Sequence, residues 1–234
     1  MTKIQKSEES YIKNIFESIS SDYDHMNDLI TFKYHSKWKK EITVIAKEDN
    51  PKVILDIATG TGDIAINLSK LKDSEIIGVD ISEKMLNVAS DKIRKMNINN
   101  ITLDISKAEK LKYRNNFFDL ISIGYGVRNF KDLISGLKES YRVLKDNGKL
   151  IILETSVPNN FLIRYIYLLF TSIYVPLISF IFTKNTKAYN YLLDSTKEFP
   201  KEDEFIKILN SVGYRNIKSR RKFFGISIIY IATK

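Results

Sequence analysis

Residues 53–63 carry the most constraining pattern of the chain, Val-Ile-Leu-Asp-Ile-Ala-Thr-Gly-Thr-Gly-Asp, and Ile-Ile-Gly-Val-Asp follows at residues 76–80. The pattern predicts an apolar strand, a glycine turn, a helix and a second strand that ends in a carboxylate. Gly60 and Gly62 leave room for a ligand to approach the backbone, and the helix that follows offers free N–H groups. Asp80 lies where a carboxylate can accept hydrogen bonds from both hydroxyls of a ribose. The pattern therefore predicts a site for an adenosine-containing ligand.

Two kinds of ligand compete for such a loop. Gly60-x-Gly62-x-x-Ala65 satisfies the dinucleotide fingerprint, and Asp80 lies near the position of its ribose-binding acid. Asp56, at the end of the first strand, would repel a diphosphate but would attract the amino group of a methionine moiety. The loop therefore favours S-adenosylmethionine over NAD. Asp56 also has a structural interpretation, as a turn or helix cap bonded to the backbone.

The composition limits the kinds of site that the chain can build. Its 234 residues, 44% of them hydrophobic, suffice for one α/β domain with additions. The absence of cysteine excludes disulfides and thiolate chemistry, and with only His25 and His35 no metal site is expected. The net charge of +9 is not gathered in a basic helix with interleaved aromatics, so it favours a membrane surface over nucleic acid. The start lacks an apolar signal segment, which predicts a cytoplasmic location.

Apolar strands alternate with helices through the middle of the chain, which predicts a parallel sheet with right-handed crossovers. Two helices, at about Tyr11–Ser20 and Ser36–Lys47, precede the sheet. The expected strands are Lys52–Ile57, Glu75–Val79, Ile101–Ile105, Phe118–Gly124 and Lys149–Glu154, and the helices between them are Asp63–Leu71, Ser82–Met96 and Leu133–Leu144. After a last helix at Glu202–Val212, the strands Tyr214–Phe223 and Ile226–Ala232 predict a hairpin at the sheet edge.

The segment Phe161–Phe182 interrupts this alternation, with Arg164 as its only charge and Pro176 near its middle. By length it could cross a membrane. Because it lies between strands of one sheet, a crossing would split the domain between two compartments. We therefore expect a bent helical pair that serves as an apolar lid or lies at a membrane interface. Such a lid above an adenosyl site suggests an apolar substrate.

Several motifs are specific enough to indicate a family. They are Tyr23-Asp-His-Met-Asn-Asp28, His35-x-x-Trp38-Lys39, Asp56-x-Ala-x-Gly-Thr-Gly-Asp63, Ala108-Glu109, Phe117-Phe-Asp119, Gly126-Val-Arg-Asn129, Tyr141-Arg-Val-Leu144 and Tyr189-x-Tyr-Leu-x-x-Ser195. With them, from about Ile15 to Lys234, the chain closely resembles the bacterial quinone C-methyltransferases of the menaquinone and ubiquinone pathways. It departs from the family pattern at Lys33, where glycine is usual, at the Asp146-Asn147 turn and at Thr155.

The resemblance implies a class I S-adenosylmethionine-dependent methyltransferase, with a Rossmann-like α/β fold and a seven-stranded, mainly parallel sheet. It also implies an N-terminal helical cover (residues 1–50), a cofactor-binding core (51–156), an apolar helical lid inserted before the last two strands (157–198), and a C-terminal helix with edge strands (199–234), all in one domain. The implied reaction is methyl transfer to a ring carbon of a polyprenyl quinol, preferably demethylmenaquinol. Such a substrate implies peripheral contact with the inner face of the membrane.

Motif alignment with the family also indicates positions that bind the cofactor. They are Thr61 with the Gly60–Gly62 backbone at the methionine end, Asp80 at the ribose, Lys107 and Ala108 at the adenine, and Gly124 near the sulfur, besides Asp56. Lys107 stands where asparagine is common, so we expect its backbone to matter more than its side chain. Asp80 has an alternative role as the N-cap of the helix that begins near Ser82.

Four residues are catalytic candidates. Arg128 and Asn129 follow the fourth strand, where side chains emerge at the carboxyl end of the sheet. Arg128 would stabilise a quinolate or hold the water that accepts the proton, and Asn129 would orient it; the alternative is a structural salt bridge with an Asn cap. Tyr23 would hydrogen-bond the ring oxygen and Asp24 would serve as base; the alternative is a folded turn with a core tyrosine. His35 is expected to seat Trp38 instead.

Other functions compete with this interpretation. A benzoquinol of the ubiquinone pathway would be an alternative acceptor. A methyltransferase for a soluble small molecule leaves Phe161–Phe182 without a purpose, and an NAD-dependent oxidoreductase lacks a Tyr-x-x-x-Lys or comparable hydride-transfer set. A non-enzymatic membrane-associated protein would account for the apolar segment alone.

Overall fold

The computed structural model describes residues 9–183 and 185–234. In that part of the chain, seven strands form one sheet in the order β3-β2-β1-β4-β5-β7-β6. The strands are β1 (Val53–Ile57), β2 (Glu75–Asp80), β3 (Ile101–Ile105), β4 (Phe118–Gly124), β5 (Leu144–Thr155), β6 (Arg215–Lys222) and β7 (Ser227–Thr233). The first five are parallel, whereas β7 is antiparallel to both β5 and β6. The expected parallel sheet and edge hairpin are confirmed.

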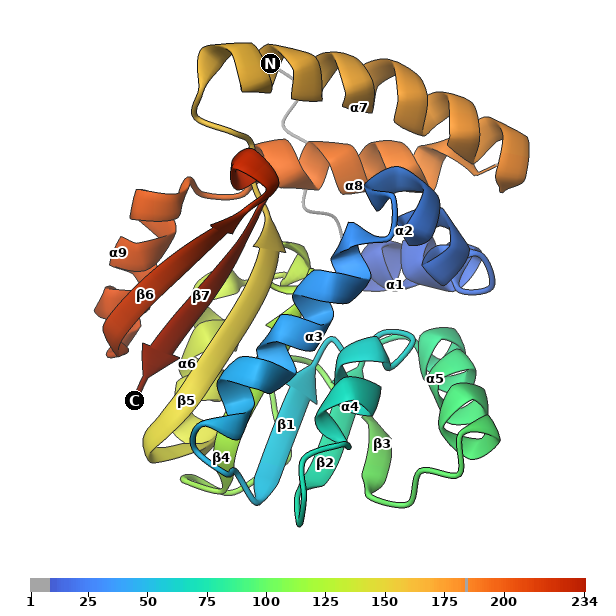
Figure 1. Ribbon diagram of the computed structural model, residues 1–234. Coiled ribbons are helices and arrows are strands. Elements are labelled where there is room, and N and C mark those ends of the chain that lie inside the picture. The colour runs from blue at the N-terminus through green and yellow to red at the C-terminus, as the bar shows by residue number, and fades with distance from the viewer. Residues whose placement is uncertain (1–8, 184) are drawn as a thin grey trace.

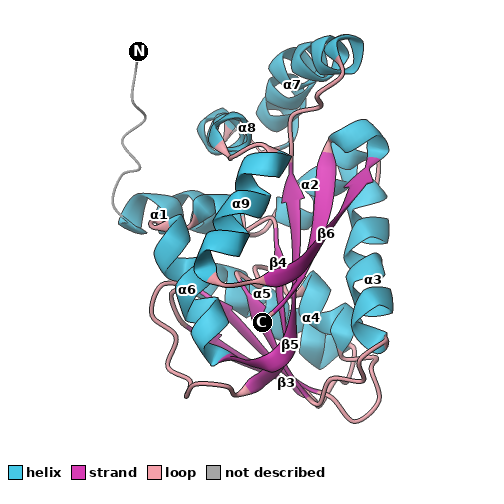
Figure 2. Cartoon of the chain, turned by 90° about the vertical axis from the view of Figure 1, so that its left-hand side faces the viewer, coloured by secondary structure: helices cyan, strands magenta, loops and turns pink. Residues whose placement is uncertain are grey.

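Helices cover both faces of this sheet (Figures 1 and 2). On one face lie α3 (Tyr34–Lys47) and α4 (Asp63–Leu68), and on the other α6 (Leu133–Val143) and α9 (Glu202–Val212). The helix α5 (Glu83–Lys95) packs near the β3 edge. Consecutive residues of β1 pack on opposite faces of the sheet. Ile54 packs toward α3 and α4, whereas Leu55 packs in the core on the side of α6 and α9. Burial on both faces explains why the central strands are apolar runs without alternation.

Four helices form a cover beyond the carboxyl ends of the parallel strands (Figure 1). They are α1 (Glu9–Ile19), α2 (Tyr23–Thr31), α7 (Phe161–Phe182) and α8 (Thr186–Glu198). The cover has its own apolar cluster, in which Ile19, Met26, Val175 and Tyr189 are buried and Met85 of α5 joins them. A separate core holds the cover in place by side-chain packing rather than by strand pairing.

The helix α7 is continuous over Phe161–Phe182, with Pro176 inside it. The predicted bent pair within this segment is therefore wrong, because α7 pairs instead with α8. A proline inside a helix removes one hydrogen bond and can leave the remaining turns intact. The side chain of Asn160 caps the helix by accepting from the N–H groups of Leu162 and Ile163. By length and composition α7 is also long enough to cross a membrane.

The helices α2 and α8 and the strand β5 depart most from the sequence prediction, in which no separate helix covers Thr186–Glu198. The helix α2 is not predicted, because Asp24, Asn27 and Asp28 are poor helix formers; its fully buried Met26 shows that tertiary packing stabilises it. The strand β5 begins at Leu144 rather than at Lys149. The residues that follow Leu144 are polar, and the register of β5 against β4 shifts between Phe118 and Leu120, so no apolar run in the sequence marks the start of this strand.

Two of the three departures from the family pattern fall where the backbone has a positive φ. Lys33, between α2 and α3, has a φ of 63°, and Asn147 in β5 also has a φ of 63°. This left-handed region favours glycine, and asparagine tolerates it better than most residues. The family's usual glycine at position 33 therefore suits this backbone, which Lys33 adopts with some strain.

Candidate active site and cofactor cavity

A small cavity of about 80 Å³ opens where β1, β2 and β4 end. Ligands of open parallel sheets bind at this edge, beyond the carboxyl ends of the strands. Its walls come from four strand ends with the loops that follow them and from the helices α1, α2 and α5: Ile12, Phe16, Tyr23, Ile57, Ala58, Gly60, Asp80, Ile81, Met85, Ser106, Ala108, Glu109, Gly124, Tyr125, Gly126, Asn129, Phe130 and Lys131. We refer to it as the cofactor cavity.

The glycine loop presents bare backbone to the cofactor cavity. Gly60 has a φ of 56°, and a Cβ built there would meet no atom within 4 Å. Gly62, with a φ of 82°, is the N-cap of α4 and packs so closely on Ala89 that a Cβ would lie 3.0 Å from the Ala89 Cβ. The open space at Gly60 leaves room for a ligand that lies directly on the loop, whereas Gly62 lets the loop pack closely against α5.

The carboxylate of Asp80 ties this loop to the next strand. One oxygen accepts from the Gly60 N–H at 2.9 Å and the other from the Ser82 N–H at 2.9 Å. Burial raises the pKa of Asp80, while these backbone donors act against the rise. The N-cap of α5 is Ser82, whose hydroxyl accepts from the Met85 N–H, so Asp80 is not the helix cap. Because Asp80 lines the cavity, its position suits a ribose hydroxyl.

Asp56 lies away from the cavity walls, contrary to the prediction of direct contact with a methionine amino group. It is buried, and its two oxygens accept from the hydroxyls of Thr59 and Ser122, both at 2.6 Å. Burial raises the pKa of Asp56 to about 6, although the two hydroxyl donors oppose the rise. Asp56 therefore holds the loop from beneath.

The remaining predicted cofactor positions divide into two groups. Ala108 and Gly124 line the cavity; at Gly124 a Cβ would lie 2.1 Å from Ile64 Cδ1, so a larger residue would require the Ile64 side chain to move. Thr61, Gly62 and Lys107 are not among the wall residues. The Thr61 hydroxyl donates to Asp24, and Lys107 is exposed, with its backbone carbonyl accepting from the Lys110 N–H at 3.3 Å. Direct contact of these three positions with the cofactor stays a prediction.

A second, larger cavity of about 440 Å³ lies between the sheet and the cover. Its volume is typical of sites for small organic ligands. Aromatic and aliphatic side chains dominate its walls: Tyr23, Asn27, Ile30, Thr31, Phe32, Tyr34, His35, Trp38, Tyr125, Arg128, Thr155, Ile163, Ile166, Tyr167, Phe170, Thr171, Val175, Tyr189, Leu192, Leu193, Thr196, Phe223, Phe224, Ile226 and Ser227. We refer to it as the apolar cavity.

Two tyrosines, Tyr23 and Tyr125, line both cavities. Tyr23 begins α2 and packs against Phe16 with the ring centroids 6.3 Å apart. Tyr125 follows β4 with a φ of 57°, and burial raises its pKa. A ligand in the cofactor cavity can thus face a ligand in the apolar cavity beside these two tyrosines. Tyr23 is brought to the site as predicted, whereas Tyr125 was missed.

Arg128 projects into the wall of the apolar cavity from the 3₁₀ turn η1 (Val127–Asn129). It is 8% exposed and forms an ion pair through Nη1 with the fully buried Glu154. Its Nη1 also donates to the Tyr125 carbonyl at 2.9 Å and its Nε to the Ser195 hydroxyl at 3.2 Å. Burial acts to lower the pKa of Arg128, but Glu154 outweighs it and the pKa is raised. Arg128 is therefore a fixed positive charge in an apolar wall.

Asn129 lies at the cofactor cavity rather than beside Arg128 in the apolar one. Its Nδ2 donates to the Tyr125 carbonyl at 3.3 Å, and its Oδ1 accepts from the Tyr191 hydroxyl at 3.2 Å. Asn129 thus connects Tyr125 to α8.

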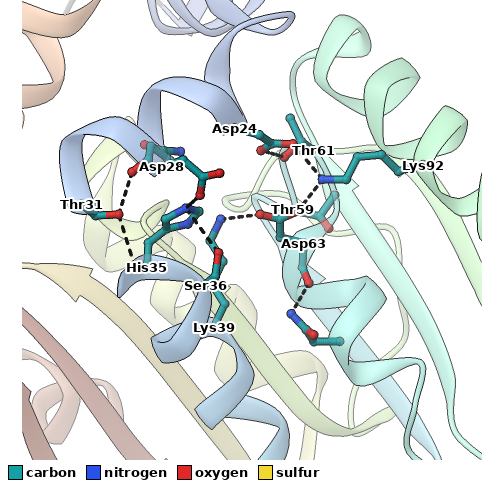
Figure 3. A network of polar contacts seen from close by, with 12 residues as sticks. Asp24, Asp28, Thr31, His35, Ser36, Lys39, Thr59, Thr61, Asp63 and Lys92 are labelled. Atoms are coloured by element: carbon teal, nitrogen blue, oxygen red, sulfur yellow. Dashed lines mark hydrogen bonds and ion pairs between the residues drawn. The ribbon is translucent and has the colours of Figure 1, made fainter. Parts of the chain in front are cut away.

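Asp24 belongs to a polar network that joins the cover to the glycine loop (Figure 3). It accepts from the Thr61 hydroxyl at 2.6 Å and pairs with Lys92 at 2.8 Å. Lys92 also pairs with Asp63, which pairs with Lys39 at 2.8 Å. Burial acts to raise the pKa of Asp63, but the two lysines outweigh it and hold the pKa well below its usual range. Asp24 lines neither cavity in this structure, and its role as a base stays a prediction.

A family model identifies the family to which the chain with these two cavities belongs. The model of the ubiE/COQ5 methyltransferase family matches residues 4–234. The chain belongs to this family. Demethylmenaquinone methyltransferases are among its relatives. That of Bacteroides fragilis is 35% identical over 98% of this chain and 94% of the relative, and that of Chlorobaculum parvum 37% identical over 99% and 95%.

Solved structures agree on the fold of this family member. An S-adenosylmethionine-dependent methyltransferase from Aquifex aeolicus superimposes with a TM-score of 0.65 at 19% identity, covering 93% of this chain and 97% of the other. A putative one from Methanococcus maripaludis gives 0.66 at 20% identity, covering 93% of each. The predicted family and class I methyltransferase fold are confirmed, and S-adenosylmethionine as the expected donor agrees with both.

Three functional features were missed at the level of sequence. Tyr125 is flanked by Gly124 and Gly126 at the end of a predicted strand, which is a signal for a side chain at the site. Glu154 ends the neighbouring strand, so the rule for parallel sheets could have paired it with Arg128. Phe16 in α1 reaches the cofactor cavity only through tertiary packing, and no local signal marks it.

Proposed function

We propose that this enzyme transfers a methyl group from S-adenosylmethionine to a ring carbon of a polyprenyl quinol, with demethylmenaquinol as substrate and menaquinol as product. The observation that carries the proposal is that a cavity on the glycine loop, with Asp80 in its wall, and a larger apolar cavity meet at Tyr23 and Tyr125. A donor and an apolar acceptor need such a junction, because in-line displacement requires the two reacting atoms in contact.

The cofactor cavity fits the proposed donor. Gly60 would lie under the methionine part, Asp80 would accept from the ribose, Ala108 would border the adenine and Gly124 the sulfur. When bound, S-adenosylmethionine supplies a methyl group on a sulfonium that is already a good leaving group. The protein must therefore align the acceptor and raise the electron density of its ring carbon.

The apolar cavity supplies the groups that the acceptor needs. The Arg128 guanidinium is charged, buried and held in place by Glu154 and Ser195. A charged N–H donor that is fixed in an apolar wall stabilises negative charge on a quinol oxygen better than a mobile, solvated one. Tyr23 would donate a hydrogen bond to the ring oxygen, and Asn129 would position the Tyr125 backbone on the cofactor side.

The relatives support the choice of a naphthoquinol head group. The proteins from Bacteroides fragilis, Chlorobaculum parvum and Geobacillus kaustophilus are all named demethylmenaquinone methyltransferase, and the last is 33% identical over its whole length. We therefore propose demethylmenaquinol ahead of a benzoquinol.

Mass spectrometry of quinones tests this function. The purified enzyme is incubated in detergent with S-adenosylmethionine and either reduced demethylmenaquinol or its demethylated benzoquinol counterpart. We expect demethylmenaquinol to gain the mass of one CH2 group. A gain on the benzoquinol alone would change the head group, and no gain on either, with S-adenosylmethionine bound, would reject a quinol acceptor.

The outer face of α7 supports contact with the inner face of the cytoplasmic membrane, where such a substrate resides. Half or more of each of these apolar side chains is exposed: Phe161, Leu162, Tyr165, Ile166, Leu169, Ile173, Leu177, Phe180, Ile181, Phe182 and, on neighbouring segments, Phe32, Phe223 and Phe224. Phe32, Phe223 and Phe224 also line the apolar cavity, so the exposed face continues into it. Exposed cations at Lys33 and Arg164 suit anionic lipid.

Vesicle flotation tests the membrane contact. We expect the wild type to float with anionic vesicles and the double variant Phe161→Ser, Phe180→Ser to remain in solution, since neither residue lines a cavity. Ile105→Ser is the control, because Ile105 is an exposed apolar residue on β3 at the far edge of the sheet. A wild type that does not float would restrict α7 to covering the apolar cavity.

A further inference from the structure

The wall of the apolar cavity contains titratable side chains of three kinds among the described residues: tyrosine, arginine and histidine. Tyrosine keeps its proton at neutral pH, and burial raises the pKa of Tyr125 and Tyr189 and raises that of Tyr167 to about 12. Arg128 is already protonated. Within the described part of the chain no Asp or Glu lines this cavity. One wall residue, His35, therefore carries a neutral nitrogen base.

The imidazole of His35 is held in a defined orientation. His35 is 3% exposed, at the start of α3, and its Nε2 lies 2.9 Å from Asp28 Oδ1 of α2 (Figure 3). The Ser36 hydroxyl lies 3.4 Å from the same nitrogen. A carboxylate only accepts hydrogen bonds, so Nε2 carries the proton and Nδ1 keeps its lone pair. The buried Nδ1 has no hydrogen-bond partner among the described residues.

Charges from three elements surround His35. Burial lowers its pKa and Lys39 of α3 lowers it further, whereas Asp28 of α2 and Asp63 of α4 raise it. The net effect is a pKa below the usual value, so the ring is neutral at physiological pH. A buried polar atom left without a partner is costly in a folded protein. An orphaned basic nitrogen on a residue that lines a substrate cavity calls for a ligand that donates to it.

We infer that His35, positioned by Asp28, is the base that accepts the hydroxyl proton of the quinol through Nδ1. This inference rests on the proposed function, because it needs a hydroxylated ring in the apolar cavity. The O–H bond breaks, an N–H bond forms at Nδ1, and the electron pair stays on oxygen, where Arg128 stabilises it. The charge moves to the neighbouring ring carbon, which takes the methyl group. The hydrogen of that carbon then leaves as a proton to water, and the imidazolium returns its proton to the oxygen.

Turnover of matched histidine variants tests the inference. His35→Gln keeps an N–H for Asp28 but removes the base, so we expect turnover to fall about a hundredfold or more with S-adenosylmethionine affinity unchanged. His25→Ala is the control, because His25 is the other histidine of the chain, is exposed and lines neither cavity. Added imidazole should restore part of the activity of His35→Ala. Wild-type turnover in His35→Gln would overturn the inference.

The pH profile separates a base from a merely structural residue. Wild-type kcat/KM should fall as the pH drops through the pKa of His35, and this acid limb should be absent from His35→Gln. Asp28→Asn removes a charge that raises this pKa, so its acid limb should move to lower pH. An acid limb that stays in place in both variants would reject the dyad.

A measurement without turnover completes the test. In ¹⁵N-histidine NMR, with His25→Ala used to assign the signals, we expect His35 to be neutral with its proton on Nε2 at neutral pH. A proton on Nδ1 would overturn the inference. If the wild type methylates no quinol, the proposed function itself fails; if it does and His35→Gln does too, the inference alone fails.

Discussion

The two cavities are built on different principles. The cofactor cavity is built on the loops that follow β1, β2, β3 and β4, with Gly60 and Gly124 keeping it open, Asp80 bonding the glycine loop in place, and α1, α2 and α5 adding a few side chains. The apolar cavity is made of side chains from α2, α3, α7, α8 and the turn after β6, which are distant in sequence. The first serves a ligand common to a whole fold class, and the second a ligand of this family. Substitutions should therefore affect one ligand without the other.

Among the substitutions that separate the two cavities, the largest effect is expected at Arg128, in the wall of the apolar cavity. Arg128→Ala should cut turnover well over tenfold, because the cation of the apolar wall is lost, while S-adenosylmethionine binding stays nearly intact. It should also lower the free energy of unfolding by about 3–5 kcal/mol, because Glu154 remains buried and unpaired. Steady-state kinetics, calorimetric binding and denaturant unfolding measure the three effects.

Arg94→Ala is the control for Arg128. It removes an exposed ion pair with Asp91 on α5 and should leave turnover and stability almost unchanged. Full turnover in Arg128→Ala would exclude Arg128 from the mechanism.

Asp56, which lies beneath the glycine loop, should make the free energy of unfolding depend on pH. Asp56 has a pKa raised to about 6, so between the pKa of an unfolded Asp and pH 6 the folded state holds a proton that the unfolded state has lost. The stabilisation that comes from this raised pKa is fully present below about pH 4. It is lost as the pH rises through about 6, and the free energy of unfolding then falls by about 3 kcal/mol. Denaturant unfolding of wild type and Asp56→Asn should diverge by this amount across the range. If the free energies of unfolding of the two proteins changed in parallel with pH, the raised pKa of Asp56 would be contradicted.

The cofactor cavity alone should respond to Asp80. Asp80→Ala removes the acceptor of the Gly60 and Ser82 N–H groups and the expected ribose contact, so the Kd of S-adenosylmethionine should rise at least tenfold, about 1.4 kcal/mol. Binding of a quinol analogue to the apolar cavity should not change, and titration calorimetry measures both. Equal losses for the two ligands would mean that the cavities do not act separately.

The smallest effect is expected at Lys107. Its side chain is exposed and lines neither cavity, so Lys107→Ala should change the Kd of S-adenosylmethionine by less than about twofold, which is under 0.5 kcal/mol. The same calorimetric titration decides this. A larger loss would give the Lys107 side chain a direct part in binding the adenine.

Most of the sheet could be predicted because its signals are local. The apolar run of β1, the Gly60–Gly62 turn and Asp80 stand close together in sequence, and parallel strands bring their carboxyl ends to one edge. Arg128 and Asn129 followed from the same rule. That rule cannot place Asp24 and Tyr23, because they belong to the cover. These neighbours in α2 have different surroundings: Asp24 pairs with Lys92, and Tyr23 lines both cavities.

The sequence by itself determined the fold class, the family and the edge of the sheet at which the chemistry lies, because periodicity and short motifs encode them. Tertiary structure alone decided that Asp56 supports the loop, that Arg128 is paired with Glu154, and that His35 lines the apolar cavity beside Asp28. The physical reason is that hydrogen-bond partners and burial depend on side chains brought together by packing. No spacing along the chain carries that information.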